Sequence, residues 1–346
     1  MEERDVGTGR LRTHCWTWGP EDGIPVLLVH GNLVSGRFWK GVAESLPPTA
    51  RVVAPDLRGF GRTEAREIDA TRGLRDWSDD MAALVHALGW SGSGRVHAAG
   101  WSLGGGVLQQ YAIDHSQDLA SLMLVAPLSP YGFGGTKDAS GTLAHEDGAG
   151  SGAGSVNPDY VRRIAEGDTS SDEPASSPRV VMRTFFWSPE YTLVDEDELL
   201  REVLRTRTGD GFYPGDSVPS EHWPGTAPGP RGVANAMAPI YCDTSSVAEL
   251  DTRIPILWLR GDQDQVVSDT SLFDLASLGQ LGAVPGWPGE EVLPPQPMLL
   301  QTRAVLERFA ARGGHYREVV LEGHAHGTVV ECPDRVAALL SELLTA

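Results

Sequence analysis

The chain has 346 residues, of which 40% are hydrophobic and 22% are charged, and its formal net charge at pH 7 is -19. This size and composition predict a globular protein that can bury a substantial core without disulfides or metals. The strong negative charge argues against nucleic acids and anionic membranes as partners, because both would be repelled.

The three cysteines, Cys15, Cys242 and Cys332, lie far apart and form no CxxC pair. This spacing argues against a disulfide framework and against a structural zinc site. The first ten residues lack the basic and apolar regions of a signal peptide, and no stretch has the roughly 18 apolar residues of a membrane span. We therefore expect a cytoplasmic protein without a membrane association.

Short apolar runs alternate with helical patterns along most of the chain. Strands are expected at residues 24–30, 51–55, 95–100, 119–126, 254–259 and 316–321. Helices are expected at residues 77–88, 103–115 and 334–344, where apolar residues recur every three or four positions. This alternation predicts an α/β fold with a mostly parallel sheet covered by helices on both faces. Residues 10–18 could add an antiparallel hairpin at one edge.

Residues 129–251 interrupt this alternation. They include a Gly/Ser-rich stretch at 134–155, an acidic, Pro-rich stretch at 168–178 and a helical pattern within 180–206. So long an interruption is usually a functional lid or a disordered segment, and its aromatic residues argue against disorder. We therefore predict a cap over 129–251 and a core formed by 1–128 and 252–346. A second Gly/Pro-rich stretch occupies 279–297.

The sequence Gly100-Trp101-Ser102-Leu103-Gly104 lies between a predicted strand and a predicted helix. This G-x-S-x-G pattern places a serine nucleophile at the tip of a tight, strained turn. The following helix directs its free N–H groups and the positive end of its dipole at the same place, where a developing oxyanion can be held. Ser102 is therefore the predicted nucleophile.

Together with this turn, His30-Gly31-Asn32 and residues 55–61 (PDLRGFG) resemble the α/β-hydrolase superfamily. The resemblance covers residues 24–126 and about 254–346. It implies the α/β-hydrolase fold and an oxyanion hole made by the backbone N–H groups of Asn32 and Leu103. Some dehalogenases of this fold also have a His-Gly-Asn sequence, but they use an aspartate nucleophile. The hydroxyl of Ser102 argues against that chemistry and against epoxide opening.

The resemblance also implies the other two members of a catalytic triad. Residues 260–267 (RGDQDQVV) match a family G-x-x-D pattern, which places the acid at Asp264 and leaves Asp262 as the alternative. After the last strand, both His324 and His326 could be the base. The family histidine lies five residues before the Glu of an E-x-P sequence, and Glu331 occupies that position here, which favours His326. The order serine, acid, histidine is that of the fold.

These residues predict a serine hydrolase that cleaves a carboxylic ester or lactone through an acyl-enzyme and needs no cofactor or metal. The expected partner is a small-molecule substrate that is uncharged, apolar and moderately large, because ligand pockets are mainly apolar. We expect the substrate pocket to be lined by Trp101, Tyr131, Phe133 and Trp187. The sequence sets no oligomeric state.

Other functions fit the same fold. An amidase or aminopeptidase would need a site for an amine, and the acidic residues 195–198 (DEDE) could supply one, although such a run more often forms a solvated helix start. A C–C bond hydrolase, a perhydrolase and a non-catalytic small-molecule-binding protein are further alternatives, because fold and triad define only a reaction class.

Overall fold

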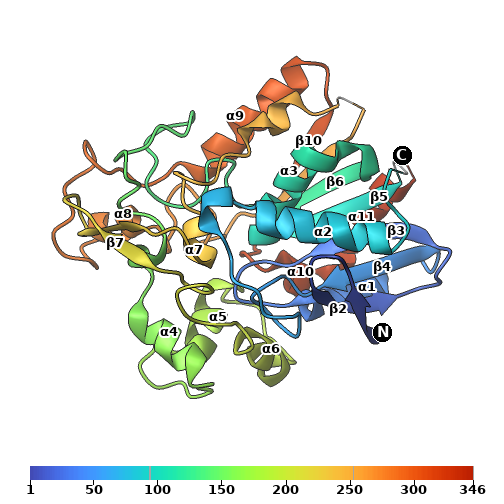
Figure 1. The fold of residues 1–346 in the computed structure, drawn as a ribbon, viewed down its shortest axis with the longest axis horizontal. Coiled ribbons are helices and arrows are strands. Elements are labelled where there is room, and N and C mark those ends of the chain that lie inside the picture. The colour runs from blue at the N-terminus through green and yellow to red at the C-terminus, as the bar shows by residue number, and fades with distance from the viewer. Residues whose placement is uncertain (93–94, 252, 346) are drawn as a thin grey trace.

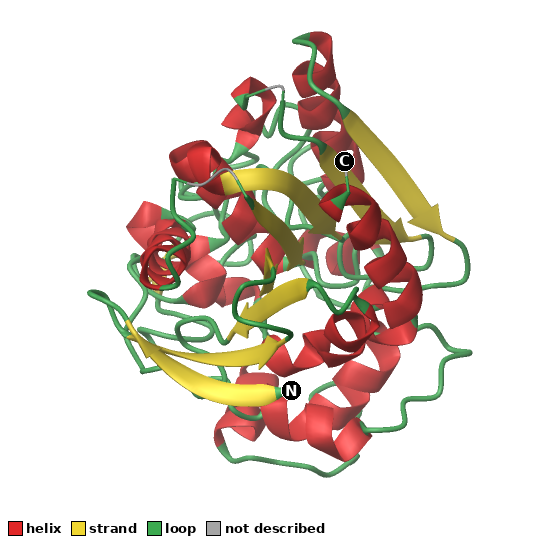
Figure 2. Cartoon of the chain, turned by 90° about the vertical axis from the view of Figure 1, so that its right-hand side faces the viewer, coloured by secondary structure: helices red, strands yellow, loops and turns green. Residues whose placement is uncertain are grey.

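The computed structural model describes residues 1–92, 95–251 and 253–345. Its centre is a twisted sheet with the strand order β1-β2-β4-β3-β5-β6-β9-β10 (Figures 1 and 2). The strands are β1 (Glu2–Gly7), β2 (Arg12–Trp18), β3 (Ile24–Val29), β4 (Ala50–Pro55), β5 (Val96–Trp101), β6 (Leu119–Val125), β9 (Ile256–Gly261) and β10 (Tyr316–Leu321). From β4 to β10 all neighbours are parallel, and β2 is antiparallel to both β1 and β4. The predicted α/β-hydrolase fold with its mostly parallel sheet is confirmed.

The alternation of side chains along the strands divides the core into two layers. Leu27, Leu122 and Trp258 point into one buried cluster, whereas their neighbours Leu28 and Met123 point into the other. Both faces are therefore buried, which explains why these strands are continuous apolar runs in the sequence.

Helices cover both faces. The first cluster includes side chains of α2 (Arg75–Ala87), α3 (Leu103–His115) and α9 (Met298–Ala311), and the second includes side chains of α1 (Lys40–Ser45) and α11 (Pro333–Leu344). The predicted helices at 77–88, 103–115 and 334–344 are confirmed within two residues at each end. No helix in the described part of the chain is long and apolar enough to cross a lipid bilayer.

The edge hairpin is larger than the segment 10–18 predicted. Its second strand, β2, falls inside that segment, but β1 begins at Glu2 and pairs with β2 from Glu2–Thr17 to Gly7–Arg12. The sequence EERDVG hides β1, because charged residues on an exposed edge strand leave almost no apolar alternation.

Residues 129–251, which we call the insert, connect β6 to the segment before β9. The insert contains α4 (Pro158–Ala165), α5 (Pro178–Phe185), α6 (Glu196–Val203), β7 (Ser217–Pro219), β8 (Thr226–Pro228) and α7 (Val233–Ala236). The helical pattern predicted within 180–206 thus corresponds to two short helices with a non-helical link. Figure 1 shows the insert's elements at the opposite end of the molecule from the two chain termini. Two further short helices lie outside the insert in the sequence, α8 (Leu275–Gln280) and α10 (Thr328–Glu331).

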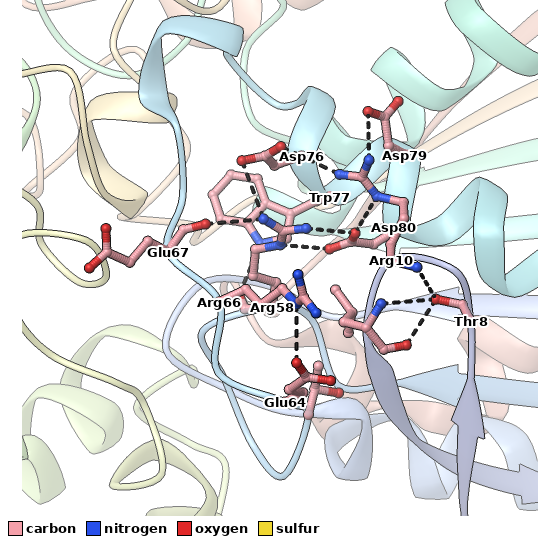
Figure 3. Close-up of polar contacts among 12 residues, drawn as sticks. Thr8, Arg10, Arg58, Glu64, Arg66, Glu67, Asp76, Trp77, Asp79 and Asp80 are labelled. Atoms are coloured by element: carbon pink, nitrogen blue, oxygen red, sulfur yellow. Dashed lines mark hydrogen bonds and ion pairs between the residues drawn. The ribbon is translucent and has the colours of Figure 1, made fainter.

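A buried ionic cluster fixes the loop that follows β4 (Figure 3). The Arg58 guanidinium donates two hydrogen bonds of 2.8 Å to Asp80 and one of 3.0 Å to the carbonyl oxygen of Glu67. Arg10 contacts the same Asp80 at 2.7 Å, and Arg72 pairs with Asp76 at 2.5 Å. The far end of this loop pairs with the insert, since the Ile68 N–H donates to Gly211. The cluster therefore stabilises the loop that the insert contacts at Gly211.

Candidate active site

The turn at Ser102 has the strained geometry that its sequence predicts. β5 ends at Trp101, α3 begins at Leu103, and Ser102 between them has φ 57° and ψ -121°. A non-glycine residue rarely adopts this conformation, and it persists only where the surrounding structure enforces it. Here the Ser102 N–H donates to the carbonyl of Val125 at 2.9 Å, and the Ser102 carbonyl accepts from Leu128 at 2.9 Å. The end of β6 and the residues that follow it therefore hold the turn in place through these two hydrogen bonds.

A close approach between backbones places α3 against the end of β3. A Cβ atom on Gly104 would lie 2.3 Å from the carbonyl oxygen of Val29 and 2.5 Å from that of His30. Only glycine fits at this position, so the first turn of α3 lies directly beside the loop that begins at Gly31.

Asp264 and His326 form a buried pair at the same edge of the sheet. The His326 Nδ1–H donates to Asp264 Oδ2 at 2.9 Å, and the two residues are 3% and 8% exposed. The other carboxylate oxygen accepts the N–H groups of Val266 and Val267 at 2.8 and 3.0 Å. This arrangement leaves the Nε2 side of the imidazole for proton transfer, as a triad requires.

The two alternative residues have other roles in the same loops. Asp262 accepts the Gly323 N–H at 2.8 Å, and the His324 Nδ1–H donates to the carbonyl of Glu322 at 2.8 Å. Neither side chain takes part in the Asp264–His326 pair. Asp262 instead ties the acid loop to the histidine loop, so that the two loops hold each other in place.

The loop after β3 is fixed by a buried, neutral histidine. The His30 Nδ1–H donates to the carbonyl of Gly31 at 2.7 Å, and His30 Nε2 accepts the Leu57 N–H at 2.8 Å. Burial lowers the pKa of His30 to about 4, so both bonds persist at neutral pH. Among the described residues, the N–H groups of Asn32 and Leu103 have no hydrogen-bond partner. Both N–H groups are thus free to donate a hydrogen bond.

Trp101 lies behind the histidine rather than open to solvent. It is 1% exposed, and its Nε1–H donates to the carbonyl of His326 at 2.9 Å. Its ring centroid lies 5.5 Å from that of His326, 5.9 Å from that of Phe38 and 6.2 Å from that of Phe186. In this structure Trp101 therefore supports the histidine loop.

The other predicted pocket residues differ in their placement. Trp187 is 3% exposed and packs against Gly327, where a Cβ would lie 2.2 Å from its ring. Tyr131 and Phe133 are half-buried and pack against the first buried cluster, the one that includes Leu27 and Trp258. The sequence reasoning missed Phe273, whose ring packs edge-on against Phe185 of the insert with centroids 4.9 Å apart. Phe273 lies on the core loop that follows Asp264, and no local motif marks it.

The acidic run at the start of α6 is not simply solvated. Glu196 forms ion pairs with Arg179 and Arg183 of α5. Glu198 accepts from the buried Arg37, which lies in the short 3-10 helix Gly36–Trp39, at 2.8 Å. These arginines already neutralise the two carboxylates, which weakens their candidacy as an amine site. Among the described residues, no group of three or more His, Cys, Asp or Glu side chains is placed to hold a metal ion.

A family model described as the alpha/beta hydrolase fold matches residues 24–296. This chain belongs to that family. A solved esterase from Exiguobacterium antarcticum superposes on this α/β-hydrolase with a TM-score of 0.62 over the whole of both chains, at 15% sequence identity. At that identity the likeness shows the fold alone.

Curated relatives of the hydrolase match over shorter segments. A 2-hydroxymuconate semialdehyde hydrolase from a Pseudomonas species is 30% identical over 125 residues, which are 35% of this chain and 42% of that protein. A pimeloyl-[acyl-carrier protein] methyl ester esterase from Aeromonas hydrophila is 34% identical over 109 residues, which are 30% and 38% of the two chains. The matches therefore span about two fifths of these relatives.

Proposed function

We propose that this α/β-hydrolase is a serine hydrolase that cleaves a carboxylic ester or lactone through an acyl-enzyme on Ser102. The observation that carries the proposal is the buried Asp264–His326 hydrogen bond of 2.9 Å, at the sheet edge where the strained Ser102 turn also lies. The Ser–His–Asp arrangement activates a hydroxyl that is otherwise a weak nucleophile.

In the proposed mechanism, His326 Nε2 takes the proton of Ser102 as the Oγ attacks the substrate carbonyl carbon. Asp264 keeps the proton on Nδ1 and stabilises the imidazolium that forms. The N–H groups of Asn32 and Leu103 receive the oxyanion of the tetrahedral intermediate. The leaving alcohol then takes the proton from His326, and water attacks the acyl-enzyme with His326 again as the base. Removing one oxyanion donor costs on the order of 100- to 1000-fold in kcat.

An uncharged, mainly apolar substrate fits the side chains near this edge. We propose that residues 129–251 act as a cap whose half-buried aromatic residues, Tyr131, Phe133 and Phe185, line the substrate pocket together with Phe273. Trp101 and Trp187 would form its buried back wall. The esterase name of the Aeromonas relative supports an ester substrate.

Cleavage of a carbon–carbon bond is the second candidate, and the similarity to a 2-hydroxymuconate semialdehyde hydrolase favours it. The same triad could serve both reactions, since each requires attack on a carbonyl carbon. Activity on simple esters separates the two, because a dedicated C–C hydrolase needs a substrate with a second carbonyl or enol group to accept the electrons of the broken bond.

The proposal is tested with p-nitrophenyl acetate, butyrate and octanoate. The wild type should hydrolyse at least one of them, and Ser102→Ala should lose the activity while keeping the same urea unfolding midpoint. Equal hydrolysis by a folded Ser102→Ala protein would exclude Ser102 as the nucleophile. Absence of hydrolysis by the wild type, followed by turnover of a vinylogous 1,5-diketone, would favour the C–C hydrolase.

A further inference from the structure

The loop that carries the proposed catalytic histidine is attached directly to the insert. The Gly327 N–H donates to the carbonyl of Phe186 at 2.7 Å, and the Tyr191 hydroxyl donates to the carbonyl of Val330 at 3.1 Å. Trp187 packs on Gly327 so closely that a side chain there would collide with its ring. His326 is thus adjacent to a junction between the core and the insert.

Glu331 lies at the centre of this junction. Its Oε1 accepts the N–H of Ser188 in the insert at 2.5 Å, and its Oε2 accepts the N–H of Ala325 in the histidine loop at 2.8 Å. Ser188 and Ala325 are only 6% and 3% exposed. One carboxylate therefore satisfies one buried amide on each side, and each of those amides is costly to leave without a partner.

From this geometry we propose that Glu331 is a positioning residue that fixes His326 and the Phe186–Ser188 wall of the site relative to each other. It acts through the backbone of Ala325, which directly precedes His326. The inference rests on the proposed function insofar as it concerns catalysis. The carboxylate itself touches neither Ser102 nor Asp264 and takes no part in the chemistry.

A glutamine cannot replace this arrangement in either orientation of its side-chain amide. A Gln side chain has one accepting oxygen and one NH2 group, so in Glu331→Gln either Ser188 or Ala325 would face a donor instead of an acceptor. Asp264 would still hold the imidazole and Trp101 would still hold the carbonyl oxygen of His326, so we expect a displaced histidine rather than an absent one. A displacement of about 1 Å can cost on the order of 100-fold in rate, and we expect kcat to fall by about tenfold or more.

Glu322→Gln is the matched control. Glu322 lies in the same loop, four residues before His326, and its side chain is exposed. Its replacement by glutamine changes the charge of the protein by the same amount as Glu331→Gln. Within the described residues its carboxylate has no hydrogen-bond partner, so this variant should keep the wild-type kcat. Both variants are compared without urea, at a temperature where their unfolding curves show each to be fully folded. A difference in kcat then cannot result from lower stability alone.

The test combines kinetics with amide hydrogen exchange on the full chain. We expect Glu331→Gln to lower kcat on a p-nitrophenyl ester more than it changes KM, and to slow labelling of Ser102 by a fluorophosphonate. In this variant at least one of the two peptides, the one containing Ser188 or the one containing Ala325, should exchange faster, whereas both should exchange at the wild-type rate in Glu322→Gln. Unchanged exchange in both peptides, or a kcat within twofold of wild type, overturns the inference. A wild type that neither labels nor turns over would instead refute the proposed function, and the exchange data would still decide whether Glu331 joins the two segments.

Discussion

The substitution Gly104→Ala tests how the two proposed oxyanion donors, the N–H groups of Asn32 and Leu103, are placed. A Cβ at this position would lie 2.3 Å from the carbonyl oxygen of Val29, whereas ordinary contacts begin near 3.4 Å. The atoms it meets are backbone atoms of β3, which cannot rotate away. The first turn of α3 must therefore retreat by about 1 Å, and the Leu103 N–H moves away from the Asn32 N–H with it.

This displacement should change both kcat and the free energy of unfolding by predictable amounts. Misplacement by about 1 Å costs on the order of 100-fold in kcat. Overpacking costs about 1–3 kcal/mol in the free energy of unfolding, of which the better helix propensity of alanine returns up to about 1 kcal/mol. We therefore expect kcat to fall about 100-fold in p-nitrophenyl ester hydrolysis, while urea unfolding shows a loss of at most about 3 kcal/mol and the protein stays folded.

Gly106→Ala is the control in the same helix. Its Cβ would meet only side-chain atoms of Leu128 and Leu74, at 3.0 Å, and these can shift by a few tenths of an ångström. It should keep kcat within a few-fold of wild type. A fully folded Gly104→Ala protein with wild-type kcat would refute the view that the close approach of α3 to β3 positions the oxyanion donors.

Three further predictions concern buried carboxylates. Asp264→Asn should keep the fold but lower kcat on the order of 10,000-fold, because the amide favours the wrong His326 tautomer; ester kinetics measure this, and a loss below tenfold would remove Asp264 from the triad. Asp80→Asn should destabilise the protein by about 3–5 kcal/mol, because it leaves the buried Arg58 partly unpaired; a urea midpoint equal to that of wild type would contradict this. Burial raises the pKa of Asp274 to about 6, so the folded protein holds this proton more tightly than the unfolded chain does. The stability of the wild type relative to Asp274→Asn should therefore rise, by up to about 3 kcal/mol, as the pH falls from about 6 to about 4. A difference that stays constant over that range would show that Asp274 titrates normally.

Local sequence patterns predicted the parts of the fold that local physics determines. The strand-turn-helix context of Ser102 predicted the tight turn between β5 and α3, because the close backbone approaches in this turn leave room only for glycine at Gly100 and Gly104. Continuous apolar runs revealed the strands that are buried on both faces. The choice of His326 over His324 followed from its spacing to Glu331, and the structure pairs His326 with Asp264.

The missed features depend on contacts between distant segments. β1 is a charged edge strand that is stabilised by pairing with β2. The sequence analysis did not predict α9, because this helix directly follows the stretch 279–297, whose Gly/Pro-rich composition is typical of loops. Phe273 and the bridging role of Glu331 become visible only when the insert folds back onto the core. The sequence does not state which segments meet across that junction.

Mass spectrometry of the intact protein after exposure to a fluorophosphonate tests the central claim most directly. We expect the wild type to gain the mass of one phosphonyl group, peptide mapping to place it on Ser102, and Ser102→Ala to gain nothing. An adduct that persists at full yield on Ser102→Ala, or a wild type that stays unmodified while it hydrolyses esters, would contradict an activated serine at this position.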